Sequence, residues 1–367
     1  MRPNGTDPDT DTSPEPAHAW SRVTSMARWL ARRRQPAGAR PRISVVMPVY
    51  NAASTLAECL TRLCNSSFGD FEIVMIDDGS TDQSRAIAGN FPVRIVPSPG
   101  RVGPAAARNL GARVAEGDVV FFMDSDVMVR SDTLARIASA FERNDLEGLV
   151  GVQAADMRHR DLVSQYKNLW MRWTYVRKQG DVPLFYTTAA AIRREAFLRA
   201  GGFDQGYATP NVEDTAFGQK LARLGVRVRI DPELEVEHVK RYSLTGLLRT
   251  DFMRAVSLTR LKLRQPRELA SNNTSVPASY MASVPLATLS ATALVAGAAL
   301  GVPVAAAAGA AGFVGTVALN HGFMTAIGAS EGWARAAGAI PLLWLELVVV
   351  GAGTGVGMLG YALGRRY

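Results

Sequence analysis

Cysteine is almost absent from this chain of 367 residues, which has only Cys59 and Cys64. Their spacing within one predicted helix fits no zinc or redox motif, so we interpret them as small core residues in a reducing compartment. The N-terminus lacks the apolar core of a signal peptide, so nothing argues for secretion of the soluble part. Aromatic residues interleaved with basic ones, the pattern of single-strand binders, are also missing, which argues against nucleic acid as a partner.

Charge is nearly absent after residue 268, although the whole chain is basic, with 41 Lys and Arg against 33 Asp and Glu. Three apolar segments in this part are each about long enough to cross a hydrocarbon core: 281–300, 302–320 and 339–363. Gly301 and Pro303 predict a tight turn between the first two. We expect Glu346, which interrupts the third, to face protein or a polar acceptor group. The region 280–363 is therefore predicted to hold two or three transmembrane helices, the alternative to three being two spans plus a re-entrant or surface segment.

Basic side chains gather beside apolar ones on either side of the middle of the chain, which is typical of contact with a membrane surface. Residues 1–42 are interpreted as a disordered segment, a basic amphipathic helix over 19–34 and a linker. Residues 241–267 predict interfacial amphipathic helices. By the positive-inside rule, these flanks place the domain between them on the cytoplasmic side of an inner or plasma membrane, in a multi-pass protein. Two arginines after the last apolar segment argue against an odd number of spans, and this conflict stays open.

Residues 43–240 alternate short apolar runs with helical segments, which predicts an α/β domain with a mostly parallel, Rossmann-like sheet. The expected strands are 43–48, 71–76, 93–96, 119–124 and 234–237. The expected helices are 54–65, 81–89 and 103–116, the last with a proline near its first turn. Ligands of such sheets bind beyond the carboxyl ends of the strands, so we expect the site there.

Two acidic clusters follow strands of this predicted sheet: Asp77 with Asp78, and Asp124 with Asp126. Because residues i and i+2 of a strand share a face, Asp124 and Asp126 are expected to point into one site. Two carboxylates that close repel each other, and Mg²⁺ or Mn²⁺ relieves the repulsion while keeping positions open for substrate phosphates. The alternative is a strand followed by an ordinary polar turn.

Several short motifs occur in a fixed order: Pro48-Val-Tyr-Asn51, Asp77-Asp78-Gly-Ser-Thr-Asp82, Ala107-Arg108-Asn109-Leu-Gly111, Asp124-Ser-Asp126, Gly201-Gly-Phe-Asp204 and Glu213-Asp214. As a set, over about 43–240, they resemble an inverting family 2 glycosyltransferase of the GT-A fold. With the apolar C-terminal part, the resemblance implies a GT-A catalytic domain followed by transmembrane α-helices.

The resemblance also implies a nucleotide-sugar donor, expected to be a UDP- or GDP-sugar. The residues that would bind it are Pro48, Tyr50, Asn51, Asp77, Asp78, Arg108 and Asp124. Asp77 and Asp78 would meet the base and ribose, because carboxylates accept hydrogen bonds from N–H and hydroxyl groups. Arg108 would bind phosphate, since a guanidinium matches phosphate oxygens in a fork.

For the chemistry, the resemblance implies a divalent metal held mainly by Asp126, with Asp124 supporting the metal or the ribose and His238 as a further ligand. Asp214 would be the general base that takes the proton of the acceptor hydroxyl, with Glu213 as the next candidate. The metal would stabilise the charge that builds on the leaving diphosphate. Each residue also has an ordinary alternative: a turn, a solvated helix face, charges at a helix N-terminus or a structural histidine.

Two departures from the family bear on the acceptor. Between 215 and 280 there is no Gln-x-x-Arg-Trp motif of the processive synthases, which favours transfer of a single sugar. The run that follows Asp124 differs from that of the dolichol-phosphate mannose synthase group, so a polyprenyl phosphate is not indicated. We expect a lipid or lipid-linked acceptor; the alternatives are an exopolysaccharide-assembly transferase with a saccharide acceptor, or a catalytically inactive membrane scaffold that binds nucleotide-sugars. Trp170, Trp173 and Tyr175 are assigned to core packing, with lining of the acceptor pocket as the alternative.

Overall fold

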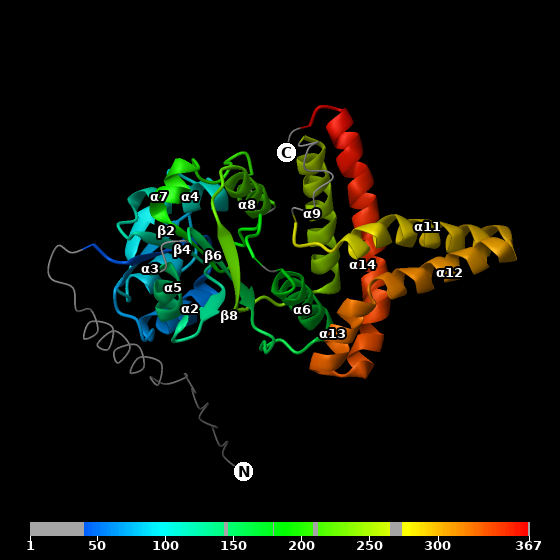
Figure 1. The fold of residues 1–367 in the computed structure, drawn as a ribbon, viewed down its shortest axis with the longest axis horizontal. Coiled ribbons are helices and arrows are strands. Elements are labelled where there is room, and N and C mark those ends of the chain that lie inside the picture. Colours follow the sequence, from blue (N-terminus) through cyan, green and yellow to red (C-terminus); the bar gives the residue numbers. More distant parts are fainter. Residues whose placement is uncertain (1–39, 143–145, 179, 208–211, 265–273, 366–367) are drawn as a thin grey trace, which may run out of the picture.

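The computed structural model describes residues 40–142, 146–178, 180–207, 212–264 and 274–365. Nearly all of the predicted N-terminal disordered segment and amphipathic helix lies outside these residues. The N-terminal half of the described chain forms one eight-stranded sheet covered by helices (Figure 1). In spatial order its strands are β3 (Arg94–Pro97), β2 (Phe71–Asp77), β1 (Ile43–Val49), β4 (Val119–Phe122), β7 (Ala190–Arg193), β6 (Gly148–Gln153), β8 (Val228–His238) and β5 (Val127–Val129).

Parallel pairing dominates one half of this sheet. β3, β2, β1 and β4 are all parallel, as the alternation of strands and helices predicted. β7 runs antiparallel to both β4 and β6, and β5 runs antiparallel to β8. The carboxyl ends of β1, β2 and β4 therefore meet at one edge, beyond which ligands of such sheets bind.

The helices of the domain follow the expected order with shifted ends: α2 (Ala53–Cys64), α3 (Ser84–Ala88), α4 (Pro104–Val114), α5 (Thr133–Phe141), α6 (Leu162–Val176), α7 (Arg194–Arg199) and α8 (Glu213–Arg223). Pro104 is the first residue of α4, where its missing N–H is not needed. Cys59 and Cys64 are both buried in α2 and both free, which confirms their interpretation as core residues.

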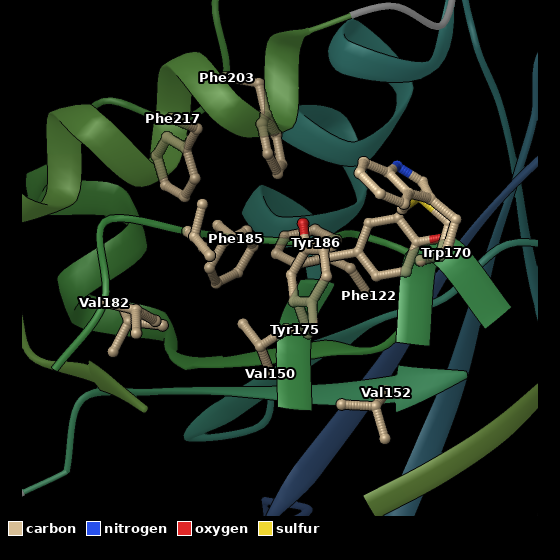
Figure 2. Close-up of a cluster of buried hydrophobic side chains, with 14 of the residues drawn as sticks. Phe122, Val150, Val152, Trp170, Tyr175, Val182, Phe185, Tyr186, Phe203 and Phe217 are labelled. Carbon is tan, nitrogen blue, oxygen red and sulfur yellow. The ribbon is translucent and has the colours of Figure 1, made fainter. Parts of the chain in front are cut away.

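An aromatic cluster fixes the end of β4 against the second half of the domain (Figure 2). Phe122, the last residue of β4, contacts Phe185, Phe197 and Phe203, and Phe203 packs on Phe217 of α8 with ring centroids 4.5 Å apart. Such aromatic pairs each add about 0.5–1.5 kcal/mol beyond their buried area. The cluster therefore joins the strand that leads into Asp124 to the helix that carries Asp214.

The C-terminal part consists of helices: α9 (Leu244–Arg264), α11 (Ala278–Leu300), α12 (Pro303–Leu319), α13 (His321–Glu331) and α14 (Trp333–Ala362). Figure 1 shows α9 beside α14, and α11 and α12 projecting from them as a hairpin. Gly301 has a left-handed φ of 65° and Pro303 begins α12, which confirms the predicted turn. Among the described helices, α11 and α14 are long and apolar enough to cross a membrane; α12 with α13, bent by 62°, gives a third span if that pair is one.

Helix α6 of the domain connects the sheet to these C-terminal helices. Glu346 of α14 is 1% exposed, accepts a hydrogen bond from the Tyr166 hydroxyl and lies 3.9 Å from the Lys167 ammonium. Lys167 also pairs with Asp251 of α9 at 2.5 Å. The expectation that Glu346 faces protein is confirmed. Among the basic residues of α9, Arg249 is exposed and Arg260 is only 9% exposed, and the interfacial position of this helix stays a prediction.

Candidate active site

The first motif joins the ends of β1 and β2. Asn51 has a left-handed φ of 51°, and its side-chain oxygen accepts hydrogen bonds from the backbone N–H groups of Thr81 and Asp82, at 2.8 and 3.3 Å. Its own N–H donates to the Ser80 hydroxyl. Asn51 thus holds two loops together at the rim of the predicted donor site. A left-handed φ is unfavourable for a residue other than glycine, and these hydrogen bonds hold Asn51 in that conformation.

Next to this turn, one aromatic ring is open to a ligand. Tyr50 is 39% exposed, and the guanidinium carbon of Arg101 lies 4.0 Å from its ring centroid. Pro48 belongs to β1, two residues before Tyr50. The ring presents a flat surface of the kind on which a nucleobase stacks.

Asp77 and Asp78 are both buried and both hydrogen-bonded within the chain. Asp77 accepts from the Ser80 N–H at 3.0 Å. Asp78 accepts from the N–H groups of Val102 and Gly103, at 2.8 and 2.9 Å, and from the Ser98 hydroxyl. A carboxylate has about four acceptor positions. Three acceptor positions of the Asp78 carboxylate therefore hold the loop before α4, and about one remains for an N–H or hydroxyl group of a ligand.

The Asp124–Asp126 run is a turn and not a strand, so the strand-alternation argument for its geometry was wrong. β4 ends at Phe122 and β5 begins at Val127, and the turn closes through the Val127 N–H to the Asp124 carbonyl at 3.2 Å. Asp124 bonds to Arg108 at 2.7 Å, whereas Asp126 bonds to His238 at 3.2 Å. The two carboxylates share one rim of the sheet but have different partners.

Arg108 connects the donor side to the candidate base. Its side chain is 5% exposed and donates to Asp124 at 2.7 Å and to Glu213 at 3.1 Å. Burial alone would lower the pKa of Arg108, but the charges of Asp124 and Glu213 raise it. The Nε atom has no partner among the described residues. Arg108 therefore braces two carboxylates through two of its five N–H groups, and its Nε–H is buried without a described partner.

Asp126, His238 and Gln153 lie together at the ends of β8 and β6. His238 ends β8 and pairs in register with Val127, which brings its Nε2 to Asp126 Oδ2. Gln153 Nε2 lies 3.4 Å from His238 Nδ1, on the side of the ring away from Asp126. Burial alone would raise the pKa of Asp126, but the hydrogen bond and charge of His238 lower it.

Within the described residues, no group of three or more His, Cys, Asp or Glu is arranged to hold a metal ion by itself. A Mg²⁺ ion usually takes one or two carboxylates together with substrate phosphates, so Asp126 with His238 fits an ion that arrives with its donor. His238 and Asp126 are brought together as predicted, while Asp124 is drawn to Arg108 instead.

Asp214 lies in the first turn of α8, and the described residues donate hydrogen bonds to one of its two carboxylate oxygens. Its Oδ1 accepts from the Thr215 N–H and hydroxyl, at 2.6 and 3.2 Å, and no described residue donates to Oδ2. Burial and the charge of Glu213 raise its pKa to about 6, against the opposing charges of Arg254 and Arg108. A carboxylate whose pKa is near the working pH suits a general base. Glu213 is 3% exposed and held by Arg108, so it is the less accessible of the two.

A cavity of about 750 Å³ begins at Asp214 and extends between the domain and the C-terminal helices. Its lining comes from α6, α8, α9, α11 and α14 and is largely apolar. Trp170 and Tyr175 belong to the buried core and Trp173 packs against it, which confirms the assignment of these residues to core packing. Trp170 and Tyr175 also line this cavity, so their contact with an acceptor stays a prediction. Figure 2 shows the two side chains next to Tyr186, which lines the cavity as well.

Sequence reasoning missed two structural residues and one cavity residue. Asn109 forms a pair of hydrogen bonds with the backbone of Phe203, at 2.8 and 2.9 Å, beside Gly202, where a β-carbon would lie 2.4 Å from Asn109 Oδ1. This contact explains why the Arg-Asn and Gly-Gly-Phe motifs occur together. Gln153 orients His238, and only the fold could reveal it. Arg254 had a signal, because it shares a helix face with Leu258 and Leu247 at spacings of four and seven residues.

This fold and site define the class of the domain: a GT-A fold with its acidic residues at the strand ends. Residues 44–200 match the model of glycosyl transferase family 2, and this part of the chain is a domain of that family. Similar curated proteins include an uncharacterised glycosyltransferase of Haemophilus influenzae, 40% identical over 111 residues, which are 29% of this chain and 44% of that one. A pre-mycofactocin glycosyltransferase of Mycobacterium tuberculosis is 28% identical over 252 residues, 66% of this chain and 52% of that one.

Among solved structures, the fold resembles a mannosyltransferase of Pyrobaculum calidifontis in complex with GDP-mannose and Mn²⁺. The TM-score is 0.54 at 21% identity, and the superposition covers 95% of this chain and 96% of that one. This likeness concerns the fold alone. The chain spans about half the length of the curated relatives it matches, with 44% and 52% of the two named above covered.

Proposed function

We propose that this protein is a membrane-anchored glycosyltransferase that moves a single sugar, with inversion, from a nucleotide-sugar to a lipid or lipid-linked acceptor. A UDP- or GDP-sugar is the expected donor, and the reaction is placed at the cytoplasmic face of the membrane. The family 2 domain supports the donor class. The finer parts of the proposal depend on the geometry around Asp214.

One observation carries the proposal: the cavity that begins at the candidate base opens onto helices that are apolar enough to lie in a membrane. Asp214 lines it at the domain end, while Leu289 of α11 and Met358 of α14 line it at the other. Leu289 is 67% exposed and Met358 is 53% exposed, so the lining continues to the outer face of these two candidate spans. A ligand in this cavity would reach the base from the bilayer.

The residues suggest how the chain would handle the donor. Tyr50 would stack on the base, and the remaining acceptor position on Asp78 would take a hydroxyl or N–H of the nucleoside. Arg108 would keep Asp124 and Glu213 in place beside the diphosphate. Asp126 and His238 would hold a Mg²⁺ or Mn²⁺ ion, which would stabilise the charge on the leaving diphosphate when bound.

Asp214 would then carry the chemical step. An acceptor hydroxyl at Oδ2 loses its proton to the carboxylate while its oxygen bonds to the anomeric carbon. The bond from that carbon to the diphosphate breaks, and the electron pair leaves with the nucleotide. Attack from the face opposite the leaving group inverts the anomeric configuration.

The test is a donor panel on the purified full-length protein. UDP- and GDP-sugars are incubated with extracted lipids and Mn²⁺, and products are identified by mass spectrometry, with Asp214→Asn as the matched inactive control. We expect one donor to give a lipid whose mass rises by one hexose-type sugar. Neither transfer nor donor hydrolysis with any donor would favour an inactive nucleotide-sugar-binding scaffold. Transfer to soluble saccharides alone would favour a role in exopolysaccharide assembly.

A further inference from the structure

Two cations line the Asp214 cavity without a carboxylate partner. Arg254 and Lys262 both belong to α9. Among the described residues, the Arg254 guanidinium contacts the Met171 sulfur at 3.9 Å, and the Lys262 ammonium contacts the Met281 sulfur at 3.3 Å. A thioether is only a weak acceptor. Among the described residues, no carboxylate lies within ion-pair distance of either cation.

Such an arrangement is costly for a folded protein. Charges removed from water are normally paired, because desolvation without a partner is strongly unfavourable. Lys167 lines the same cavity and follows the rule, since it pairs with Asp251 at 2.5 Å. Burial lowers the pKa of Lys262, as expected for an ammonium that lacks this compensation. Burial alone would lower the pKa of Arg254, but the charges of Asp214 and Asp251, which also line the cavity, raise it. Lys262 has no such compensation, so an anionic group placed between the two cations would neutralise chiefly its charge.

The rest of the lining indicates what kind of anion fits. Val284 and Leu289 of α11 and Val350 of α14 give the outer part an apolar surface, in helices that are candidate membrane spans. A largely apolar lining that also includes Arg254 and Lys262 matches a molecule with a hydrocarbon chain and a charged head group. A free small anion would leave most of this surface without a partner.

The candidate base indicates the nucleophile. A phosphate monoester has a second pKa of about 6, so at neutral pH it already presents an ionised oxygen and needs no base. A hydroxyl group does need one, and Asp214 lines the same cavity with an unused oxygen. The acceptor that uses every part of the site has a hydroxyl to be glycosylated and a separate anionic group to be held.

We propose that the acceptor is an anionic membrane phospholipid whose head group carries a free hydroxyl, and that Arg254 and Lys262 bind its phosphodiester. This inference rests on the proposed function and names its acceptor class. The lipid chain lies along α11 and α14, and the phosphodiester meets the two cations. The head-group hydroxyl gives its proton to Asp214 as its oxygen displaces the nucleoside diphosphate from the anomeric carbon.

Three short-chain lipids separate the two features of the head group. Phosphatidylglycerol has both the charge and a hydroxyl, diacylglycerol has only the hydroxyl, and phosphatidic acid has only the charge. Binding to the full-length protein in neutral detergent is measured by native mass spectrometry, and transfer is measured with the donor from the panel. We expect phosphatidylglycerol to bind and be glycosylated, phosphatidic acid to bind and inhibit, and diacylglycerol to bind at least about tenfold more weakly.

Variants of α9 test the two cations. Arg254→Gln and Lys262→Gln should each weaken binding of phosphatidylglycerol by about tenfold and raise its KM, with donor affinity little changed. Lys262→Gln should also leave kcat nearly unchanged, whereas Arg254→Gln removes a charge that lowers the pKa of Asp214 and should shift the pH profile of kcat to higher pH. Arg254→Lys, which keeps the charge, should recover part of the loss and guards against a folding defect of the glutamine variant. Arg249→Gln is the matched control, because it removes the same charge from an exposed position of α9 outside the cavity.

The outcomes distinguish the two proposals. Unchanged binding of phosphatidylglycerol by both glutamine variants, or equal binding of diacylglycerol by the wild type, would overturn the anionic-lipid site. Transfer to a neutral lipid alone would uphold the transferase and overturn the anionic acceptor. Binding that depends on Arg254, with no transfer from any donor, would uphold the lipid site and count against the transferase function.

Discussion

The donor side and the acceptor side of the site treat charge in opposite ways. At the strand ends, Asp78 accepts two backbone N–H groups and a hydroxyl, and Asp124 is paired with Arg108. Around the cavity, the described residues place no carboxylate within ion-pair distance of Arg254 or Lys262, whose nitrogens contact methionine sulfur atoms. On the proposed donor side the protein itself pairs these carboxylates. On the proposed acceptor side Arg254 is balanced at longer range by the charges of Asp214 and Asp251, and Lys262 has no carboxylate partner among the described residues.

This difference teaches which side depends on a ligand for its stability. A network whose members satisfy one another is rigid before any substrate arrives, and so it can position a donor without reorganisation. Cations without a partner lower the free energy of unfolding of the ligand-free protein. An anionic ligand that binds only the folded state raises this free energy again. Changes on the donor side should therefore disturb structure and donor binding together, and changes on the acceptor side should affect acceptor use alone.

The largest effect is expected where the two sides meet. Asp214→Asn keeps shape but cannot take a proton, so kcat should fall by roughly 10²–10⁴-fold. Donor affinity, measured by calorimetry with Mn²⁺, should stay near that of the wild type because the donor residues lie at other strand ends. A parallel loss of donor affinity and rate would instead make Asp214 a binding or structural group, and Glu213 would be the next base to test.

A smaller effect is expected for the metal position. Asp126→Asn should weaken metal and donor binding together by about tenfold or more, since the diphosphate would then lack a well-held cation. Titration of Mn²⁺ with and without donor, by calorimetry, measures both affinities. Chelator should abolish transfer by the wild type, and full activity in chelator would refute the metal assignment.

Asp78→Asn should lower stability by about 1–3 kcal/mol, because two backbone N–H groups and a hydroxyl share its buried carboxylate. Thermal unfolding in detergent measures the change, and weaker donor binding should accompany it. Asp118→Asn is the matched control at an exposed position and should leave Tm within error. An unchanged Tm for Asp78→Asn would mean that the loop before α4 does not need this carboxylate.

The smallest effect concerns pH. The pKa of Asp214 is raised to about 6 from a usual value of 3.8, so the folded protein binds more protons than the unfolded chain between these values. The contribution of this group to stability is thus largest below 3.8 and declines as pH rises through about 6. Asp214→Asn should raise Tm slightly at pH 7 and less at pH 5. For the wild type, kcat/KM should decline below about pH 6, since the base becomes protonated.

Much of the fold could be predicted from sequence because its signals are local. Apolar runs such as Phe71–Asp77 followed by turn residues identify strands of a parallel sheet, and Pro104 marks the start of α4. The antiparallel placement of β7 and β5 could not be predicted, since pairing direction depends on chain segments that meet only in the folded sheet. The same limit applies to the Asp124–Asp126 turn. The sequence predicted a strand up to Asp124, two residues beyond the observed end of β4 at Phe122.

The candidate site was predicted as a set of residues but not as a set of contacts. Asp126 and His238 are 112 positions apart and do meet, as the resemblance implied. Arg108 was expected at a phosphate, yet it braces Asp124 and Glu213, because a buried guanidinium needs more partners than one ligand supplies. Arg254 was taken as one of several interfacial arginines, and only the packing of α9 against α6 and α14 reveals the cavity it faces.

The two cysteines of α2 have a practical consequence for mapping the membrane topology. Cys59 is 0% exposed and Cys64 is 1% exposed, and burial raises the thiol pKa of Cys64 to about 12. Both thiols should resist maleimide reagents in the native protein. In a variant with one added cysteine at Gly301, between α11 and α12, maleimide labelling would therefore come from that cysteine and not from the native thiols. Whether a reagent outside a sealed vesicle reaches it shows on which side of the membrane Gly301 lies. A second at Gly364, after α14, would reveal whether the chain crosses the bilayer an even or an odd number of times.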